Sequence, residues 1–290
     1  MISVNKSSSH LSLLKLRVEH WSFHSLVYLL LFIGVFFMLV PFYWMVITAF
    51  KPRADLLIYP PHFFVHHPVL DSFRELFRLI PMKRYIFNSL WVAGCVTVAN
   101  LFLCSMAGYA FAKHNFWGKE KIFMILMGSM MIPWQVNIIP GFIIVKNLGW
   151  LSTYRGLIVP AMAGAFGIFL MRQFIREIPD DLIDSARIDG CGEFSIYWRI
   201  ILPLCRPALA TLSIFIFIQQ WNNFVWPLII IHKSEMRTIP VALSVLNGQF
   251  GGSFGLLMAG AVISILPMVI AFFIFQKQII KSFAFEGIKQ

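Results

Sequence analysis

The sequence predicts an all-α polytopic membrane protein with six transmembrane helices, and three observations support this fold class. Of its 290 residues, 59% are hydrophobic and only 13% are charged. Its mean hydropathy is +0.76. A soluble domain carries about a quarter charged residues, so this chain has too few charges for a fully water-exposed surface. Six long apolar runs, nearly free of Asp, Glu, Lys and Arg, lie at 26–50, 86–112, 122–145, 156–171, 205–231 and 256–276.

The length of these runs predicts one helix in each. Most reach the roughly 20 residues that a helix needs to cross the hydrocarbon core, and the short fourth run can extend toward Arg176. Lipid tails offer no hydrogen-bond partners, so the backbone N–H and C=O groups must bond to one another, as they do in a helix. A β-barrel would instead show short segments of alternating hydropathy. We therefore expect six spans.

The first run marks the start of the predicted membrane domain. It is too long for a secretory signal, and no pair of small residues with cleavage-site spacing follows it. We expect it to remain as the first span. The sequence thus predicts a cytoplasmic N-terminal segment at 1–25 and a transmembrane domain at 26–290, with both termini cytoplasmic.

The distribution of basic residues supports this orientation. With a cytoplasmic N-terminus, the larger share of the 24 Lys and Arg residues lies on the cytoplasmic side, as the positive-inside rule expects. The net charge of +11 does not indicate nucleic-acid binding, because the basic residues are spread over loop ends rather than gathered in one domain. They suit the anionic headgroups of a lipid bilayer instead.

A polar stretch at 180–203 lies between the fourth and fifth predicted spans. Pro179 followed by Asp180 and Asp181 is typical of a helix start, because acidic residues favour the positive end of the helix dipole. Leu182, Ile183 and Ala186 would share one face of this helix. Gly190 can end it by taking the left-handed conformation.

A second short helix is predicted after Gly190. Its apolar residues recur at helical spacing as Phe194, Tyr197, Trp198 and Ile201. Two short helices joined by a glycine turn would make a compact knob with an acidic rim. We interpret it as a docking surface. The alternative is an amphipathic linker in the lipid interface, which six acidic residues in or beside the stretch disfavour because anionic lipid repels them.

The same stretch resembles a motif of bacterial ATP-binding-cassette (ABC) importers. Their membrane subunits carry Glu-Ala-Ala-x-x-x-Gly, nine residues, then Ile-x-Leu-Pro. The spacing is intact here, with Asp in place of Glu and Ser in place of the first Ala. The resemblance implies that coupling to an ATPase involves Phe194 of the second helix and these motif positions: Asp184, Ser185, Ala186, Asp189, Gly190, Ile200, Leu202 and Pro203.

Further segments resemble carbohydrate-type permeases of this class. They are 131–140, 148–157 and 221–228, with shorter matches at 41–44, 89–90 and 108–112. Together they are similar to the smaller subunit of a maltose-type pair with a type I importer fold. The resemblance implies a second permease as heterodimer partner, two ATP-binding subunits, an extracytoplasmic solute-binding protein and a carbohydrate substrate. ATP and magnesium would bind the partner subunits, and the location would be the bacterial inner membrane.

Amide side chains within the predicted spans are candidates for a substrate path. Asn222 and Asn223 lie between Trp221 and Trp226, and a sugar is bound by amide hydrogen bonds and flat aromatic faces. Gln135 and Asn137 lie between two prolines that interrupt a span and free carbonyls toward a cavity. The alternative for these amides is hydrogen bonding between helices.

Other functions lack the residues they need. A phosphate-binding Gly-x-x-x-x-Gly-Lys-Ser/Thr loop is absent, so the chain is not expected to bind ATP or to be an enzyme. An ion-coupled secondary transporter remains the alternative function, although it would normally carry acidic residues within its spans. His62, His66 and His67 lack a supporting carboxylate or thiolate for a metal site. The four cysteines show no Cys-x-x-Cys spacing and are expected to be free thiols.

Overall fold

The computed structural model describes residues 6–250 and 253–287, and these residues form helices and loops without any strand. This confirms the all-α class. Two compact units are present, one made of residues 1–73 with 254–262 and the other of residues 74–253 with 263–290. The α-helices are α1 (Lys6–Ala49), α2 (Asp71–Leu79), α3 (Met82–Lys113), α4 (Lys119–Ser129), α5 (Ile138–Asn147), α6 (Tyr154–Ile158), α7 (Ala165–Arg176), α8 (Asp180–Ile188), α9 (Glu193–Ile196), α10 (Leu202–Leu204), α11 (Arg206–Trp221), α12 (Val225–Ile230), α13 (Ile239–Phe250) and α14 (Phe254–Gly287).

The first unit contains α1 and the loop that follows it. Lys51, whose side chain is buried, donates a hydrogen bond to the carbonyl of His62 at 2.6 Å and lies 4.4 Å from the ring centre of Trp44. Tyr43 donates to the carbonyl of Phe63 at 2.6 Å. A short 3₁₀ helix, η1 (Arg53–Leu56), lies within this loop. These contacts fold the His- and Phe-rich loop back onto the end of α1.

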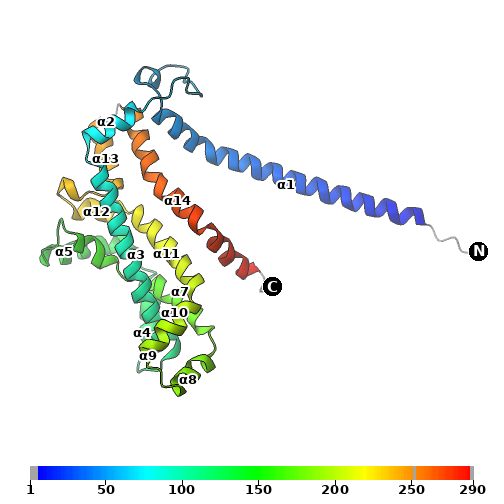
Figure 1. The fold of residues 1–290 in the computed structure, drawn as a ribbon, viewed down its shortest axis with the longest axis vertical. Coiled ribbons are helices and arrows are strands. Elements are labelled where there is room, and N and C mark those ends of the chain that lie inside the picture. Colours follow the sequence, from blue (N-terminus) through cyan, green and yellow to red (C-terminus); the bar gives the residue numbers. More distant parts are fainter. Residues whose placement is uncertain (1–5, 251–252, 288–290) are drawn as a thin grey trace, which may run out of the picture. The chain divides into compact units, whose positions relative to one another are not determined.

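The second unit is organised around α3. This long helix packs along both α7 and α11 (Figure 1). The contact faces are apolar and fully buried, as at Val96 and Cys104 of α3, Met171 of α7 and Leu212 of α11. Burial of side chains this size contributes about 1.5–3 kcal/mol each in water; within lipid the gain comes from close packing instead. The α3 helix is therefore the scaffold that positions the rest of this unit.

Two glycines permit the close approach of α3 and α7. A Cβ placed on Gly108 of α3 would lie 2.7 Å from the Cβ of Met171 and 2.9 Å from the backbone nitrogen of Arg172. A Cβ on Gly167 of α7 would lie 2.7 Å from the sulfur of Cys104. Small residues at helix contacts are typical of membrane proteins, because backbones then approach closely enough for dispersion and polar contacts.

The predicted spans are present in part as straight helices and in part as bent pairs. Three helices are long and apolar enough to cross a membrane, at His24–Ala49, Met82–Lys113 and Phe254–Phe273. Three bent pairs bring the possible total to six: Lys119–Ser129 with Trp134–Asn147, Tyr154–Ala161 with Ala165–Arg176, and Glu193–Leu204 with Arg206–Trp221. The chain is thus a multi-pass membrane protein with three to six spans.

The expected continuous helices at 122–145, 156–171 and 205–231 are wrong in detail. The first is broken before Pro133, and its halves, α4 and a second piece formed by η2 (Trp134–Asn137) and α5, meet at 94°. Proline lacks the N–H that would continue the helix, and its ring clashes with the preceding turn. The second is bent by 41° around Gly164 after η3 (Val159–Ala161). The third stops at Trp221 and resumes as α12 at Val225.

Gly108 provides a test of the α3–α7 packing, with Gly94 as its matched control on the same helix. Nothing lies within 4 Å of a Cβ at Gly94. We expect Gly108→Ala to lower the free energy of unfolding by about 1–3 kcal/mol, because the extra methyl overpacks the interface. Gly94→Ala should leave it unchanged or raise it by up to about 1 kcal/mol through helix propensity. Thermal denaturation in detergent, followed by size-exclusion fluorescence, measures both, and equal melting temperatures would contradict the packing described.

Candidate coupling site and substrate path

The first helix of the knob (residues 178–203) forms as its sequence predicts. Helix α8 begins at Asp180 directly after Pro179, with Asp180 and Asp181 in its first turn. Ile183 and Ala186 are buried on one face. Leu182 was expected on that face but is 45% exposed. Adjacent residues on a helix point about 100° apart, so the buried face of α8 includes Ile183 but not Leu182.

Gly190 makes the predicted left-handed turn. Its φ is +81°, and open space surrounds the position of a Cβ. The Gly190 N–H donates to the carbonyl of Arg187 at 3.0 Å, and the Cys191 N–H donates to the carbonyl of Ala186 at 2.9 Å. These bonds satisfy the last carbonyls of α8 and direct the chain into α9. The turn therefore depends on backbone conformation rather than on space for a side chain.

The expected apolar stripe of the second helix is split between two faces. Ile196, Tyr197 and Ile201 are buried, whereas Phe194 and Trp198 are 63% and 56% exposed. A π-helical turn, η4 (Tyr197–Ile201), lies here in place of the expected α-helix. Its hydrogen bond joins residues five apart, the Leu202 N–H and the Tyr197 carbonyl, and Ile196 and Ile201 lie on the inner face. Phe194 and Trp198 stack on each other on the outer face, with ring centres 6.3 Å apart.

Lys113, the last residue of α3, anchors the start of α8. Its ammonium donates to the carbonyl of Ile178 and to Oδ1 of Asp180, the latter at 2.6 Å. The Lys113 side chain is 5% exposed and that of Asp180 is 74% exposed. The hydrogen bond from Lys113 lowers the pKa of the Asp180 carboxyl below its ordinary value of 3.8. A carboxyl whose pKa is lowered by folding stabilises the folded protein at any pH above its ordinary pKa. This stabilisation is lost as the pH falls from the ordinary pKa through the lowered folded-state pKa. The Asp180 carboxyl is thus ionised at neutral pH.

A second set of contacts joins α3 to α9. Tyr109 donates from its hydroxyl to Glu193 at 2.9 Å, and Arg187 of α8 donates to the other carboxylate oxygen at 2.8 Å. The hydroxyls of Ser105 and Tyr197 lie 2.8 Å apart. Charged hydrogen bonds that share one carboxylate hold both partners in place. Helices α8 and α9 are therefore fixed to the same end of α3 (Figure 1).

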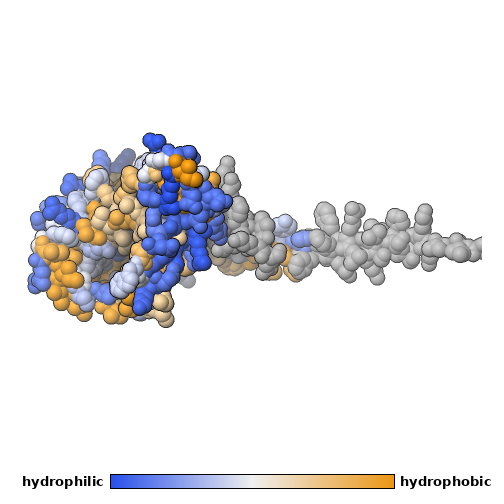
Figure 2. Space-filling view, turned by 90° about the horizontal axis from the view of Figure 1, so that it is seen from below, coloured by the Kyte–Doolittle hydropathy of each residue, from blue (hydrophilic) through white to orange (hydrophobic). Residues whose placement is uncertain are grey.

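The outer surface of the knob combines exposed apolar and acidic side chains. Ile188 is 87% exposed, alongside the stacked pair Phe194 and Trp198. Asp181 and Asp189 are exposed, and no ion pair involves them within the described part of the chain. Viewed from below, hydrophilic residues cover much of this end, with hydrophobic patches among them (Figure 2). Apolar side chains rimmed by charge are typical of protein interaction sites.

The other motif positions occupy defined places in the knob. Asp184 pairs with Arg187 at 3.0 Å, so its charge is partly compensated within the chain. Ser185 donates back to the carbonyl of Leu182 at 3.1 Å. Ile200 and Leu202 are half-buried. Pro203 lies inside α10, and the bend of 79° comes after Leu204. Proline is accepted in the first turn of a helix, where no N–H is needed.

Sequence reasoning missed the residues of α3 that hold the knob. Tyr109 and Lys113 lie 84 and 67 positions from their partners Glu193 and Asp180. A polar or charged residue at the end of an apolar run is a weak signal of such a contact. Asn88 was missed for the same reason. It is fully buried, and a buried amide requires partners.

Asn88 holds together three segments at the other end of α3. Its side-chain nitrogen donates to the carbonyls of Glu235 and Arg237 at 2.8 and 2.9 Å, around the short helix η5 (Ser234–Met236). Its oxygen accepts a hydrogen bond from the Tyr154 hydroxyl at 2.7 Å. The neighbouring Ser89 accepts from the Ile239 N–H at 2.8 Å. These bonds tie α3 to α6 and to the connection between α12 and α13.

The candidate path residues lie at breaks between helices. Asn222 is exposed and donates to the carbonyl of Ile218 at 3.0 Å, and Asn223 donates to Gln220 at 3.3 Å. Both of these bonds are local to the end of α11. Gln135 and Asn137 are exposed in η2, at the break after Pro133. The structure thus leaves all four amides on surfaces, at two separate breaks.

The two tryptophans beside Asn222 and Asn223 serve the packing of this region. Trp221 is 1% exposed and donates its indole N–H to the carbonyl of Ser264 in α14 at 3.0 Å. Trp226 donates to the carbonyl of Gly156 in α6 at 3.0 Å. Trp221 therefore does not present an aromatic face to a sugar. Its role is to fix the end of α11 against α14.

The cysteines and possible metal ligands can be described briefly. All four cysteines, Cys95, Cys104, Cys191 and Cys205, are free thiols. Within the part of the chain that the structure describes, no group of three or more His, Cys, Asp or Glu side chains could hold a metal ion.

Comparison with known proteins gives the family. Residues 102–284 match the model of the binding-protein-dependent transport system inner membrane component. The matched range includes the knob and the segments that form α7, α11 and most of α14. The chain belongs to this family. It is therefore a subunit of a multi-pass inner-membrane importer, and its family is one of transport components rather than enzymes.

Curated relatives match along most of their length. The arabinooligosaccharides transport system permease protein AraQ of Bacillus subtilis (strain 168) is 36% identical over 254 residues, covering 87% of this chain and 90% of AraQ. The lactose transport system permease protein LacG of Rhizobium radiobacter is 28% identical, covering 88% of this chain and 92% of LacG. These matches agree with the carbohydrate-type ABC permease resemblance seen in the motifs.

A solved structure shows the same fold. It is a bacterial ABC transporter described as involved in the import of the acidic polysaccharide alginate. One of its chains superposes with a TM-score of 0.79 at 21% identity, covering 96% of this chain and 99% of that chain. The arrangement of helices is thus that of an ABC importer permease, as the type I resemblance predicts.

Lys113 provides a test of the anchor, with Lys119 as a matched control near the same membrane face. Lys113→Gln removes the charge that holds Asp180, so we expect amides of 180–190 to exchange faster with deuterium by about tenfold, the factor for 1.4 kcal/mol. Lys119→Gln should leave these amides unchanged, because no ion pair joins Lys119 to the knob in the described residues. Hydrogen-exchange mass spectrometry measures both, and equal exchange in the two variants would exclude the anchor.

Proposed function

We propose that this chain is a permease subunit that translocates a carbohydrate, specifically an oligosaccharide, across the bacterial inner membrane. ATP hydrolysed by partner subunits, with magnesium bound there, supplies the energy. The relatives described for arabinooligosaccharides and lactose support a carbohydrate cargo. The remote similarity to the alginate importer supports only the fold, because its identity is 21%.

The main support for the proposal is the exposed surface of the knob. It is a compact projection with an exposed Phe194–Trp198 pair and exposed acids, held rigidly on the end of α3. A surface of this kind suits a protein partner better than lipid, because anionic headgroups repel exposed carboxylates. The coupling residues proposed for the partner ATPase are Asp184, Ser185, Ala186, Asp189, Gly190, Phe194, Ile200, Leu202 and Pro203.

The proposed assembly contains further subunits. A second permease completes the membrane domain as a heterodimer, and two ATP-binding subunits dock on the cytoplasmic face, where the knob and both termini lie. The family description names binding-protein-dependent transport, which supports an extracytoplasmic solute-binding protein as the source of substrate. Closure of the ATPase dimer would push the knob, and α3 would follow because Lys113 and Tyr109 join it to the knob.

The proposed substrate path passes the broken ends of the spans. Three exposed amides lie there, Asn222 after α11 and Gln135 and Asn137 in η2, with the half-buried Asn223 next to Asn222. A broken helix frees backbone groups that can face a water-filled cavity. An ion-coupled secondary transporter remains less suitable, since the apolar runs carry no Asp or Glu for a proton relay.

Gly190 and Gly192 make a matched pair for testing coupling. Gly190 has φ +81°, which a β-branched residue adopts only with strain, whereas Gly192 has φ −72° and ψ 156°, which suits valine. Nothing lies within 4 Å of a Cβ at either position. We expect Gly190→Val to lower sugar transport per ATP hydrolysed by about five- to thirtyfold, the effect of about 1–2 kcal/mol of backbone strain. Gly192→Val should transport normally.

The measurement is transport and ATP hydrolysis by the purified complex in proteoliposomes. Uncoupling restricted to Gly190→Val supports the knob as the coupling element. Normal coupling in both variants would refute it, and loss in both would mean that the side chains, not the turn, disturb docking.

Cysteines at Asn222 and Leu212 test the path. Asn222 is exposed directly after α11, and Leu212 is fully buried within α11. In a cysteine-free background that still transports, Asn222→Cys should react with a water-soluble maleimide, and its rate should change at least severalfold between nucleotide-free and ATP-bound states. Leu212→Cys should stay unreactive. An Asn222→Cys thiol that remains unlabelled in every state would place these amides outside the path.

A further inference from the structure

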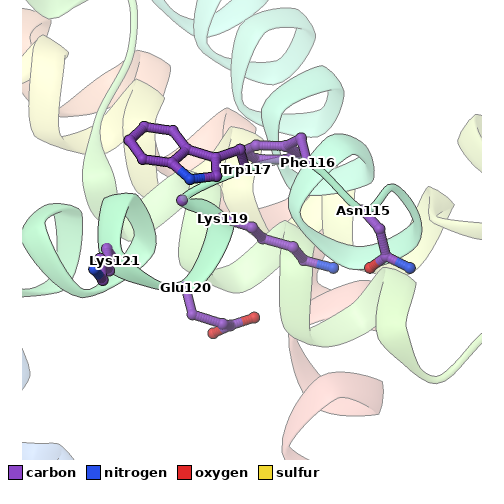
Figure 3. Close-up of a pocket in the computed structure, with 7 residues that line it drawn as sticks. Asn115, Phe116, Trp117, Lys119, Glu120 and Lys121 are labelled. Carbon is purple, nitrogen blue, oxygen red and sulfur yellow. The ribbon is translucent and has the colours of Figure 1, made fainter.

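The connection between α3 and α4 exposes an aromatic side chain to an unusual degree. Trp117 is 96% exposed and the adjacent Phe116 is 41% exposed. Residues 115–121 line a hollow of about 410 Å³. Trp117 and Phe116 lie together at its upper side, Lys119 extends beneath them toward Asn115, and Lys121 lies beyond Glu120 (Figure 3). A tryptophan so fully exposed to water is costly unless something covers it.

The charge around this hollow is positive. Glu120 is held by Arg172 of α7 at 2.7 Å, and Arg172 also lies 3.8 Å from the ring centre of Phe123. That carboxylate is therefore already compensated. Within the described residues, no ion pair involves Lys119 or Lys121. Two ammonium groups without an ion pair thus border the hollow, that of Lys119 toward Asn115 and that of Lys121 beyond Glu120 (Figure 3).

The position of this loop fixes its level relative to the membrane. It begins directly after Lys113, where the span Met82–Lys113 ends. On its other side, α4 continues with exposed apolar residues, Ile122, Met124 and Ile125 at 43%, 62% and 72%. An exposed apolar helix face that starts at the loop belongs in hydrocarbon. The loop therefore lies where the headgroups of the bilayer meet the acyl chains.

The residue types of this loop are those found at the membrane interface. Tryptophan is enriched at the membrane interface, and lysines next to it attract the anionic lipids of the cytoplasmic leaflet. A second protein subunit is a poorer fit. The knob at the same end of α3 is acidic, so a subunit surface that complements it is basic and would repel Lys119 and Lys121.

We propose that residues 115–121 bind the headgroup of an anionic phospholipid in the leaflet on the knob's side of the membrane. The ammonium group of Lys119 contacts the lipid phosphate, that of Lys121 adds positive charge on the other side of the loop, and Trp117 inserts at the level of the headgroups. Bound lipid covers Trp117 and fixes the depth of the α3–α4 connection beside the knob.

Photo-crosslinking from position 117 tests the proposal directly. Benzoylphenylalanine replaces Trp117 in the chain purified with its partner subunits, in nanodiscs of equal parts phosphatidylcholine and phosphatidylglycerol. Mass spectrometry then identifies the crosslinked molecules. We expect phospholipid, with phosphatidylglycerol enriched over phosphatidylcholine by about fivefold for each lysine, which corresponds to about 1 kcal/mol per basic residue near the surface.

Charge-matched variants complete the test. Lys119→Gln with Lys121→Gln should return the crosslinked lipid to the bulk ratio, whereas Lys146→Gln with Lys233→Gln removes equal charge elsewhere and should keep the enrichment. Crosslinks to a protein subunit, or lipid at the bulk ratio with both lysines present, would overturn the proposal. If the double variant fails to assemble, the ratio in the protein with both lysines still decides. Because the readout requires no transport, it is independent of the proposed function.

Discussion

The attachment of the knob to the end of α3 is the constraint on which the rest of the structure depends. Lys113 holds the start of α8 through Asp180 and the Ile178 carbonyl, and Tyr109 holds the start of α9 through Glu193. Ion pairs of this kind add little stability where they are exposed. Here the Lys113 side chain is 5% exposed, so water competes little for its ammonium group and the bond holds the start of α8 in a fixed place. Any force on the knob is thereby transmitted to a long helix.

The packing of α3 extends this rigidity through the second unit. Gly108 and Gly167 bring α3 and α7 into close contact, and the buried Cys104 and Met171 fill the space between them. At the far end, Asn88 binds α6 and the segment around η5. One helix thus links the knob with the loops at the opposite end. Movement of the knob without movement of α3 would require the hydrogen bonds from Lys113 to Asp180 and from Tyr109 to Glu193 to break.

Much of this architecture could be predicted from the sequence, because membranes allow few solutions. Apolar runs of sufficient length imply helices, and Gly190 was identified as a left-handed turn from its place after an amphipathic helix. The helix breaks could not be placed in the same way, since Pro133 indicates a weak point but not a bend of 94°. The π-turn at 197–201 could not be predicted either, because a single extra residue in one turn leaves no pattern in the sequence. Contacts such as Tyr109 with Glu193 join residues 84 positions apart and leave no local pattern.

The distance between the knob and α3 during the ATPase cycle tests the central claim most directly. Spin labels at Ile188→Cys and Val98→Cys would occupy exposed positions on α8 and α3. Electron–electron double resonance on the assembled importer, in a cysteine-free background, gives the label separation with and without trapped ATP. A rigid attachment predicts one narrow distance distribution that is the same in both states. A distribution that shifts or splits when ATP binds would show that the knob moves independently of α3 and would contradict the account.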